Sequence, residues 1–323
     1  MSGSPIDLGG LDEDGAPEGR PAADDAAKGP PTVGVIGLGR MGRPMAERLV
    51  SAGFHVTVHN RSREPVEALA AQGARTAESA ADVRADMVIT LLPDSETVEA
   101  LTLEAARPNA LFVDMSTSPP ALAVKLAEAL RERGATALDA PVSGGVTGAR
   151  EGTLTIMVGG EAADLERARP VLEVLGAKIT HVGGAGAGQI AKAANQLVVA
   201  LNIQAVAEAL SLARAAGVDP AVVREALLGG FADSRVLQEH GQRMLDRDFE
   251  PGGALRLHLK DLEIARGLAA QHGATLPAGD GVAAAVRALV DAGHGGLDHS
   301  ALVTRYDAAP SAHSAQPDAD RDA

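Results

Sequence analysis

The chain has 323 residues, no cysteine, and 43 acidic against 29 basic side chains, which gives a net charge of −14 at pH 7. The missing cysteine excludes a disulfide framework, a thiol nucleophile and a thiolate metal site, and the acidic balance argues against a general nucleic-acid-binding protein. We find neither a signal peptide nor a run of about 18 apolar residues, so we expect a cytoplasmic protein without membrane or nucleic-acid partners.

The two ends of the chain differ in composition from the middle. Residues 1–31 and 308–323 are rich in Gly, Pro, Ala, Ser and Asp and carry much of the negative charge. Segments of low hydrophobicity with clustered acids cannot bury enough apolar surface to offset the entropy of ordering. We therefore predict two disordered tails with the folded protein between them.

A short apolar run followed by a glycine motif opens the folded part. Residues 32–37 (TVGVIG) predict a buried strand, and residues 37–42 (GLGRMG) lead from it into a predicted helix. A GxGxxG motif alone is weak among 37 glycines. Between a strand and a helix, however, it indicates a dinucleotide-binding turn, where glycines let a pyrophosphate approach the helix N-terminus. The predicted cofactor-binding residues here are Gly37, Leu38, Gly39, Arg40 and Met41.

The end of the second predicted strand, residues 55–59, bears on the choice of cofactor. An NAD enzyme usually places an acid about 20 residues after the fingerprint, on the ribose 2′-hydroxyl. Here Asn60, Arg61 and Ser62 follow the strand, and the next acid is Glu64. Because Arg61 would bind a 2′-phosphate that an acid would repel, we expect NADP(H) to be favoured, with NAD(H) possible. The alternative is that Arg61 only lines an exposed loop.

Helices and strands then alternate, as a parallel α/β sheet requires. An open parallel sheet binds its ligand at the carboxyl ends of its strands, and Leu92, Pro93 and Ser116 follow two such ends. The predicted helices are residues 63–72, 96–103, 121–133 and 161–175, and the predicted strands are residues 87–92, 111–114, 136–139, 153–158 and 178–182.

A glycine-rich stretch lies between two of these strands. Ser143, Gly144 and Gly145 offer a hydroxyl and unshielded backbone N–H groups, a combination that can hold a carboxylate. An ordinary loop is an equally good interpretation of the stretch by itself.

The pattern becomes all-helical near residue 185. Residues 189–216 contain no proline and many alanines, which predicts one helix of roughly 42 Å at ~1.5 Å per residue. Residues 197–201 are apolar around a full turn, so we expect the middle of this helix to be buried on all sides. Further helices are predicted over residues 220–228, 236–245, 254–272, 276–292 and 299–306. We therefore predict an α/β Rossmann-type domain over residues 32–184 and an all-α domain over residues 185–307, joined through the long helix.

One lysine near the start of the long helix is a candidate acid/base. Lys192, Asn195 and Gln196 are spaced i, i+3 and i+4, so they share one helix face. Only five of the 29 basic side chains in the chain are lysines. Lysine can lose its proton near neutral pH when it is desolvated, whereas arginine cannot. The alternative is an ordinary solvated lysine on a helix surface.

Four stretches together resemble the β-hydroxyacid dehydrogenase family. The resemblance covers about residues 32–306 and implies an N-terminal NAD(P) domain, an all-α C-terminal domain and a homodimer or homotetramer. It also implies metal-free interconversion of a 3-hydroxy acid and its semialdehyde, a small carboxylate substrate. The stretches are residues 37–45 (GLGRMGRPM), 139–145 (DAPVSGG) with 152–160 (GTLTIMVGG), 186–196 (GAGQIAKAANQ) and 260–262 (KDL).

Within the family the chain looks most like the tartronate semialdehyde (2-hydroxy-3-oxopropionate) reductase branch. Shared features include residues 200–203 (ALNI) and 257–261 (LHLKD). The chain departs from the branch at Asn60, where an acid is common, and at Phe231, in a loop expected to touch substrate. The alternatives are 3-hydroxyisobutyrate dehydrogenase and glyoxylate or succinic semialdehyde reductase. An imine reductase or a non-catalytic NADP-binding protein is less favoured, because Ser143 and Lys192 are both present.

The resemblance also implies a role for each site residue. Lys192 would be the catalytic proton donor to the substrate carbonyl, and Lys260 would contact the cofactor, with Asp261 holding local structure. A plain surface pair of Lys260 with Asp261 is the alternative. No histidine falls in the four stretches that carry the family resemblance, so we expect all nine at surface or loop positions. The implied substrate-binding residues are Ser116, Ser143, Gly144, Gly145, Asn195, Gln196 and Phe231, and the further cofactor-binding residues are Asn60, Arg61, Ser62, Leu92 and Pro93.

Overall fold

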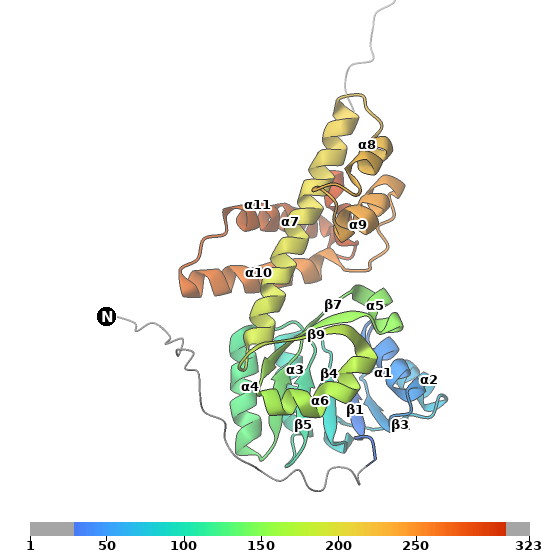
Figure 1. Cartoon of the computed structure of the whole chain (residues 1–323), viewed down its shortest axis with the longest axis vertical. Coiled ribbons are helices and arrows are strands. Elements are labelled where there is room, and N and C mark those ends of the chain that lie inside the picture. Colours follow the sequence, from blue (N-terminus) through green and yellow to red (C-terminus); the bar gives the residue numbers. More distant parts are fainter. Residues whose placement is uncertain (1–28, 308–323) are drawn as a thin grey trace, which may run out of the picture. The chain divides into compact units, whose positions relative to one another are not determined.

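A mostly parallel sheet is the scaffold of the first half of the chain (Figure 1). The computed structural model describes residues 29–307, and in that part of the chain the sheet has nine strands. Its order is β3-β2-β1-β4-β5-β6-β8-β7, with β9 also paired to β8, and β8 runs antiparallel to β6 and β7. The strands are β1 (Val33–Ile36), β2 (Val56–His59), β3 (Arg75–Thr76), β4 (Met87–Thr90), β5 (Leu111–Asp114), β6 (Thr136–Asp139), β7 (Val142–Ser143), β8 (Leu154–Gly160) and β9 (Gly176–Gly183).

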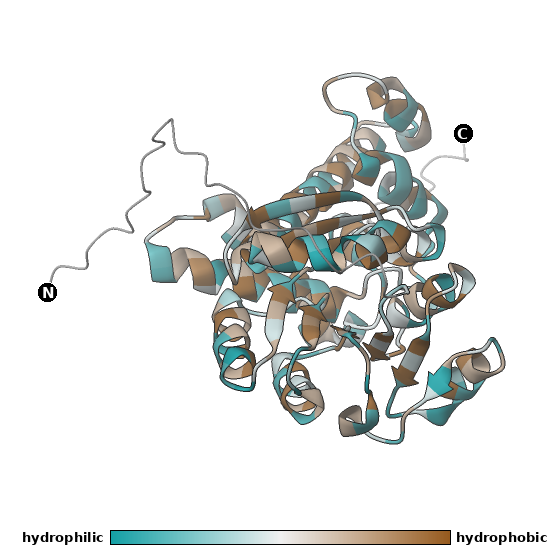
Figure 2. Ribbon diagram, turned by 60° about the horizontal axis from the view of Figure 1, so that its bottom comes forward, coloured by the Kyte–Doolittle hydropathy of each residue, from teal (hydrophilic) through white to brown (hydrophobic). Residues whose placement is uncertain are grey.

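Helices cover both faces of the sheet, as expected for strands that are apolar throughout. Successive side chains of a strand point to opposite faces. Val33 and Val35 of β1 accordingly pack in one core with residues of α1 and α6, whereas Ile36 packs in a second core with residues of α3 and α4. In Figure 2 the strands carry mostly hydrophobic colours and the surrounding helices are mixed. The helices of this half are α1 (Gly42–Ser51), α2 (Arg63–Ala70), α3 (Ser95–Ala105), α4 (Pro120–Glu132), α5 (Gly145–Glu151) and α6 (Ala162–Leu175).

The second half of the described chain is helical and is built on α7 (Ala187–Ala215), a helix of 29 residues. Its N-terminal part contacts β8 and β9, and its later turns pack against helices of the second half (Figure 1). A separate apolar core, which includes Ile203, Leu255 and Leu302, fills the space between these helices. The remaining elements are α8 (Pro220–Leu227), α9 (Arg235–Asp246), α10 (Leu255–His272), α11 (Pro277–Leu289), the π-turn η3 (Val290–His294) and the 3-10 helix η4 (His299–Tyr306).

The predicted fold class is confirmed, and most predicted elements are present within a few residues. The sequence patterns missed β3, β7, α5 and the short 3-10 helix η2 (Ala80–Asp82), because each is too short to show a period. The predicted tails over residues 1–31 and 308–323 lie almost entirely outside the described residues. The predicted division of the folded part at residue 185 stays a prediction.

One prediction about the long helix is wrong. The middle of α7 is not buried on all sides, because Val198 is 57% exposed and Leu212, further along, is 72% exposed. The helices of the second half cover one side of α7, where Ala200, Ile203 and Ala207 are buried. The sequence analysis found no run of about 18 consecutive apolar residues. By its length and its mean hydropathy, however, α7 is long and apolar enough to cross a membrane. In the described chain α7 packs against β8 and β9 and against α9, α10 and η4.

Candidate active site

The glycines of residues 37–42 divide into two that shape the turn and one that faces open space. Gly37 has a φ of 100°, and a Cβ atom there would lie 2.4 Å from the Leu91 carbonyl oxygen. A Cβ atom on Gly42 would lie 1.9 Å from the Gly37 carbonyl oxygen. A Cβ atom on Gly39 would meet nothing within 4 Å. The turn therefore needs Gly37 and Gly42 for its own shape, and Gly39 leaves backbone accessible where a pyrophosphate is expected.

The end of β2 contacts this turn through Asn60. The Asn60 Oδ1 atom accepts a hydrogen bond of 3.0 Å from the Leu38 N–H, and its Nδ2 donates to the Ser62 carbonyl. The side chains of Arg40 and Arg61 are exposed, and neither forms an ion pair within residues 29–307. The structure thus brings Leu38, Asn60 and Ser62 together and leaves both arginines free to meet an anionic cofactor.

The ends of β4 and β5 are also joined. The buried Ser116 hydroxyl oxygen accepts a hydrogen bond of 2.9 Å from the Leu92 N–H. Gln189, in the first turn of α7, donates to the Ser116 carbonyl and accepts from the Ser118 N–H. Gln189 is 1% exposed, so the loop after β5 is held by a side chain that water does not reach. Sequence reasoning did not identify Gln189, although it lies in the family motif.

Lys192 is buried and held at the start of β7. Its Nζ donates to the Val142 carbonyl at 2.8 Å and to the Gln196 Oε1 at 2.9 Å. Burial lowers the pKa of Lys192 to about 8, with Asp261 raising it and Lys260 lowering it. The prediction that this lysine is desolvated enough to exchange a proton near neutral pH agrees with this environment.

The predicted face of α7 forms a hydrogen-bonded row. The Asn195 Nδ2 donates to the Gln196 Oε1 at 2.9 Å, and the Gln196 Nε2 donates to the Asp261 carboxylate at 2.6 Å. Gln196 thus connects the lysine to α10. The orientation of its amide group is set because its oxygen accepts from Lys192 and Asn195 while its nitrogen donates to Asp261. Asp261 was expected only to hold local structure, and it does so through Gln196.

The Ser143–Gly145 stretch is part of a helix start rather than a free loop. Ser143 ends β7, Gly144 has a φ of 132°, and α5 begins at Gly145. Because Ser143 directly follows Val142, this helix start adjoins the Lys192 ammonium group. The first N–H groups of a helix have no partners within it, so they remain available to an anion. The expectation of a carboxylate-binding stretch beside the lysine is consistent with this position.

Lys260 links the two halves of the described chain. Its Nζ donates to the Thr117 carbonyl at 2.7 Å, in the loop after β5, and lies 3.5 Å from the Asp261 Oδ1. The pairing with Asp261, which was the alternative to a cofactor contact, is therefore present. While it is paired with Asp261, the Lys260 side chain also lies beside the loop that carries Ser116.

One predicted residue is not brought to this site. Phe231 lies in the loop between α8 and α9, and its side chain is fully exposed. Its neighbours Gly229 and Asp233 bond to each other, and within the described residues neither bonds to Lys192 or Ser143. A role of Phe231 in substrate contact stays a prediction.

The expectation that all histidines are at the surface or in loops is wrong. His258 of α10 is buried, its Nδ1 shares a hydrogen bond of 2.8 Å with the His299 Nδ1, and His299 Nε2 contacts the His240 Nε2 at 2.7 Å. The other nitrogen of His258 contacts the Gln196 carbonyl at 3.2 Å. These residues lie far apart in sequence, so no local pattern marks them.

This histidine cluster resembles a metal site only at first sight. Ligand atoms of His240, His299 and Asp298 lie within 4.8 Å of one another. However, the Asp298 carboxylate already accepts hydrogen bonds from the backbone of Gly252, Gly253 and Ser300, and Arg243 lies 3.1 Å away. Asp298 therefore acts as an anchor for its loop, and the adjacent guanidinium disfavours a cation.

Both halves of the chain match known families. Residues 32–183 match the family described as the NAD binding domain of 6-phosphogluconate dehydrogenase. Residues 186–306 match the family described as NAD-binding of NADP-dependent 3-hydroxyisobutyrate dehydrogenase.

Curated relatives match over nearly their whole length. The chain is 44% identical to 2-hydroxy-3-oxopropionate reductase of Escherichia coli, over 84% of this chain and 95% of the relative. It is 39% identical to 3-hydroxyisobutyrate dehydrogenase of Pseudomonas aeruginosa, over 85% and 98% of the two chains. It is 37% identical to NAD-dependent L-serine dehydrogenase of the same species, over 85% and 97%.

Solved structures match the whole described fold. The 3-hydroxyisobutyrate dehydrogenase of Mycobacterium tuberculosis with L-serine has a TM-score of 0.79 at 38% identity, over 86% of this chain and 99% of the other. The protein Psf3 in complex with NADP+ and 2-OPP has a TM-score of 0.79 at 29% identity, over 85% and 99%. With a dinucleotide turn at one end of the sheet and a buried lysine on the helix beside it, the chain belongs to the β-hydroxyacid dehydrogenase family of NAD(P)-dependent oxidoreductases acting on CH–OH groups.

Proposed function

We propose that the protein is an NADP(H)-linked reductase of 2-hydroxy-3-oxopropionate that also oxidises the corresponding 3-hydroxy acid. The observation that carries the proposal is the buried Lys192 ammonium group, held by Val142 and Gln196 beside the start of α5. The 44% identity to the Escherichia coli reductase supports this substrate among those of the family. We also propose a cytoplasmic location.

The chemistry follows from where charge develops. When bound, a nicotinamide cofactor supplies the hydride. Negative charge then builds on the carbonyl oxygen of the substrate, and a positioned acid that donates a proton there contributes roughly 10²–10⁴ in rate. We assign this proton transfer to the Lys192 Nζ, whose pKa of about 8 allows it to donate and be reprotonated near neutral pH.

The remaining site residues bind and orient the substrate. We assign the substrate carboxylate to the Ser143 hydroxyl and to the backbone N–H groups of Gly144 and Gly145, where the helix start favours an anion. Asn195 and Gln196 orient the carbonyl end and keep Lys192 in place. Ser116 completes the set of proposed substrate contacts, and Phe231, which lies outside the site described above, stays a predicted one.

The proposed cofactor site lies along the carboxyl ends of the strands. The open backbone at Gly39 and the exposed Arg40 and Arg61 fit a dinucleotide carrying a 2′-phosphate. Asn60 is neutral, so it does not repel that phosphate, and it orders the turn through Leu38. NADP(H) is therefore the proposed preference, although one relative is named as NAD-dependent and another is bound to NADP+. We further propose that Met41, Ser62, Leu92, Pro93 and Lys260 line this site.

A second candidate substrate is another small 3-hydroxy acid. L-serine is present in the Mycobacterium tuberculosis structure and in the name of the Pseudomonas aeruginosa relative. L-serine and 3-hydroxyisobutyrate carry the carboxylate and the 3-hydroxyl that the proposed site recognises, so the same residues could act on either.

A substrate panel tests the proposal. The absorbance of the reduced nicotinamide is followed with 2-hydroxy-3-oxopropionate, glyoxylate and succinic semialdehyde in reduction, and with glycerate, 3-hydroxyisobutyrate and L-serine in oxidation. We expect the highest kcat/KM with 2-hydroxy-3-oxopropionate and NADPH, and no turnover by Lys192→Met. A tenfold preference for 3-hydroxyisobutyrate or L-serine would assign the second candidate instead. Turnover that persists in Lys192→Met would remove the proposed chemistry.

A further inference from the structure

The start of α7 has no cap of its own. Its N-cap residue is Gly186, which has no side chain, and no acidic residue lies in its first turn. The first N–H groups of a helix lack partners within the helix and need an acceptor from elsewhere. Asp139, the last residue of β6, supplies one: its Oδ1 accepts from the Gly186 N–H at 2.7 Å and its Oδ2 from the Gln189 N–H at 2.9 Å.

The next strand, β7, holds the lysine. Val142 follows Asp139 by three residues and accepts from the Lys192 Nζ, and Lys192 follows Gln189 by three residues, about one helical turn. Two short segments are thus joined at two places, once through the carboxylate and once through the ammonium group. A shift of the first turn of α7 relative to residues 139–142 would therefore move the Lys192 Nζ from its acceptor.

Glycine backbone encloses the Asp139 carboxylate. A Cβ atom on Gly159 would lie 2.5 Å from its Oδ1, and a Cβ atom on Gly188 would lie 2.8 Å from its Oδ2. These contacts leave no room for a larger residue on either side, so the carboxylate is desolvated and depends on the two N–H donors.

We propose that Asp139 is a positioning residue for Lys192. The ionised carboxylate of Asp139 keeps the first turn of α7 docked on β6, and so keeps the proton donor in register. This proposal rests on the assignment of Lys192 as the proton donor. The carboxylate acts through α7 and does not touch the reacting atoms.

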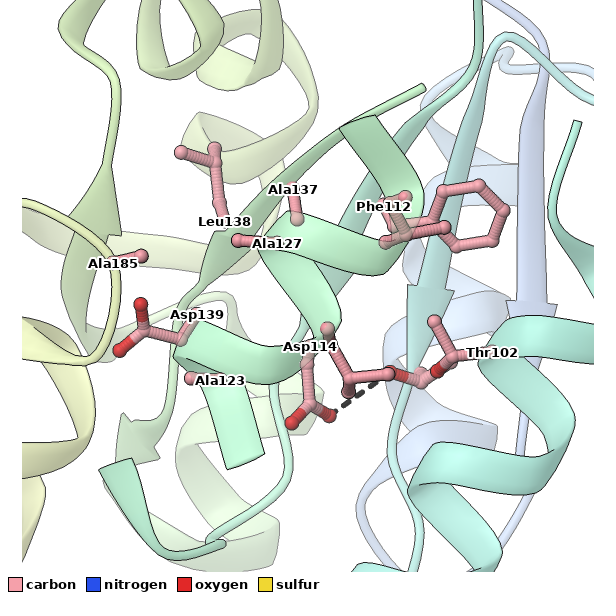
Figure 3. Close-up of a pocket in the computed structure, with 12 residues that line it drawn as sticks. Thr102, Phe112, Asp114, Ala123, Ala127, Ala137, Leu138, Asp139 and Ala185 are labelled. Carbon is pink, nitrogen blue, oxygen red and sulfur yellow. Dashed lines mark hydrogen bonds between the residues drawn. The ribbon is translucent and has the colours of Figure 1, made fainter. Parts of the chain in front are cut away.

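The surroundings of Asp139 make its ionisation sensitive to pH. Burial raises the pKa of Asp139 to about 6, against the lowering effect of its two backbone hydrogen bonds, and Asp114 of β5 adds repulsion. Both carboxylates line a cavity of about 20 Å³. Its lining from α4 is uncharged and includes Ala123 and Ala127, which Figure 3 shows with the two carboxylates. On β8 the residue paired with Asp139 is Gly159, which has no side chain, and the charged side chain in the first turns of α7 is Lys192, bonded to Val142.

Protonation would disrupt this contact. A neutral carboxyl group carries an O–H donor on one of its oxygens, which would then face a backbone N–H donor. Because burial raises the pKa of Asp139 above that of a carboxyl group in water, proton uptake does not by itself detach α7. It does leave one of the two N–H groups without its acceptor, so we expect this contact to loosen and kcat of the reduction to fall as the pH falls through about 6. Because a small misplacement of a catalytic group costs on the order of 10²-fold in rate, the effect on kcat is measurable.

The decisive variant is Asp139→Asn, whose amide has nearly the same shape but only one acceptor oxygen. We expect kcat at pH 7 to fall on the order of 10- to 100-fold, with the dissociation constant of NADPH unchanged. The wild-type kcat profile should have an acid limb near pH 6 and an alkaline limb near pH 8. The variant should lose the acid limb and retain the alkaline one. An acid limb that persists in the variant would overturn the proposal.

Asp164→Asn is the matched control. Asp164 is also a buried carboxylate tied to β6, but at its opposite end, where it accepts from the Thr136 hydroxyl. If loss of a buried carboxylate acted only through general stability, the control would change the pH profile as Asp139→Asn does. We expect the control to keep both limbs.

A measurement without substrate separates this proposal from the proposed function. Hydrogen-exchange protection factors of the Gly186 and Gln189 amides should fall in the wild type below pH 6, and at all pH values in Asp139→Asn. The wild-type series needs no variant, so it applies even if the substitution prevents folding. Unchanged protection across pH 6 would overturn the proposal whatever the substrate. Loss of protection without a matching loss of kcat would place the error in the role of Lys192.

Discussion

At the scale of single residues, the site depends on how burial changes one ammonium group. Lys192 is buried, and both acceptors of its Nζ, Val142 and Gln196, are uncharged. Removing water disfavours the charged form, which is why the pKa of Lys192 falls to about 8. In reduction the lysine must carry its proton, so kcat should be level between about pH 6 and pH 8 and fall above pH 8. In oxidation it must be neutral, so kcat should rise through the same range.

Substitution of Lys192 by arginine tests proton transfer directly. Arginine keeps the positive charge but cannot release a proton near neutral pH. We expect Lys192→Arg to lose about 10²-fold or more in kcat while NADPH binding, followed by fluorescence, stays near that of the wild type. Near-complete activity of Lys192→Arg would mean that the lysine serves only as a charge that holds the substrate.

Cofactor preference should depend on two residues at the end of β2. The double variant Asn60→Asp, Arg61→Ala removes a cation and adds an acid where the 2′-phosphate is expected. A hydrogen bond to a charged group contributes about 1.5–3 kcal/mol, so kcat/KM should shift toward NADH by at least an order of magnitude. The single variant Arg61→Lys, which keeps the charge, is the control. A wild type that already prefers NADH would contradict the proposed NADP(H) preference.

The glycine turn offers a separation of cofactor binding from folding. Gly39→Ala adds a methyl group that meets nothing within 4 Å in the protein but would stand where the pyrophosphate approaches. We expect NADPH affinity to fall at least tenfold with Tm unchanged. Gly37→Ala should instead lower the free energy of unfolding by roughly 1–3 kcal/mol, because of its positive φ and its clash with Leu91. Normal NADPH binding by Gly39→Ala would contradict this assignment.

At the scale of elements, a row of histidines joins α9, η4 and α10 to the carbonyl of Gln196 on α7. Burial lowers the pKa of His240 and His258, and it lowers that of His299 to about 3. The unfolded chain binds protons on these imidazoles below about pH 6.5, whereas the folded chain does not until lower pH. The contribution of these histidines to the free energy of unfolding is therefore complete above about pH 6.5 and is lost as the pH falls below about 6.5.

We expect urea unfolding to show this loss. Between pH 7.5 and 5.5 the free energy of unfolding should decrease by about 1 kcal/mol for each histidine that stays neutral. His299→Gln should reduce that decrease, whereas His55→Gln, at an exposed position, should not change it. An equal pH dependence in wild type and His299→Gln would show that the histidine row does not set acid stability.

At the scale of the whole molecule, the exposed side of α7 predicts assembly. Ile190, Val198 and Leu212 are exposed and lie on a similar side of one helix. Exposed apolar side chains that gather on one surface are typical of an interface. We propose that this side of α7 joins copies of the chain into a homodimer or homotetramer.

Charged substitutions on this surface test the assembly. The double variant Val198→Glu, Leu212→Glu should be a monomer by light scattering, because burying two carboxylates in an apolar interface is unfavourable. Val222→Glu, at an exposed apolar position on α8, is the control and should keep the wild-type mass. A wild type that is monomeric at micromolar concentration would remove this proposal.

The sequence by itself determined whatever depends on residues close together in the chain. The alternation of helices and strands, the glycine turn, and the shared face of Lys192, Asn195 and Gln196 all follow from spacings of two to four residues. The predictions for these features agree with the structure. Short elements such as α5 lacked a readable period and were missed.

Only the tertiary structure decided which distant groups meet. Asp139 reaches α7 across 47 residues, Lys260 reaches the Thr117 carbonyl across 143, and His299 reaches His258 across 41. Burial follows from the same packing. A local apolar pattern therefore wrongly placed the middle of α7 inside, and the lack of a motif wrongly placed His258 outside. A pKa depends on burial and on nearby charges, so the properties of Lys192 and Asp139 arise only once the two halves of the chain are folded together.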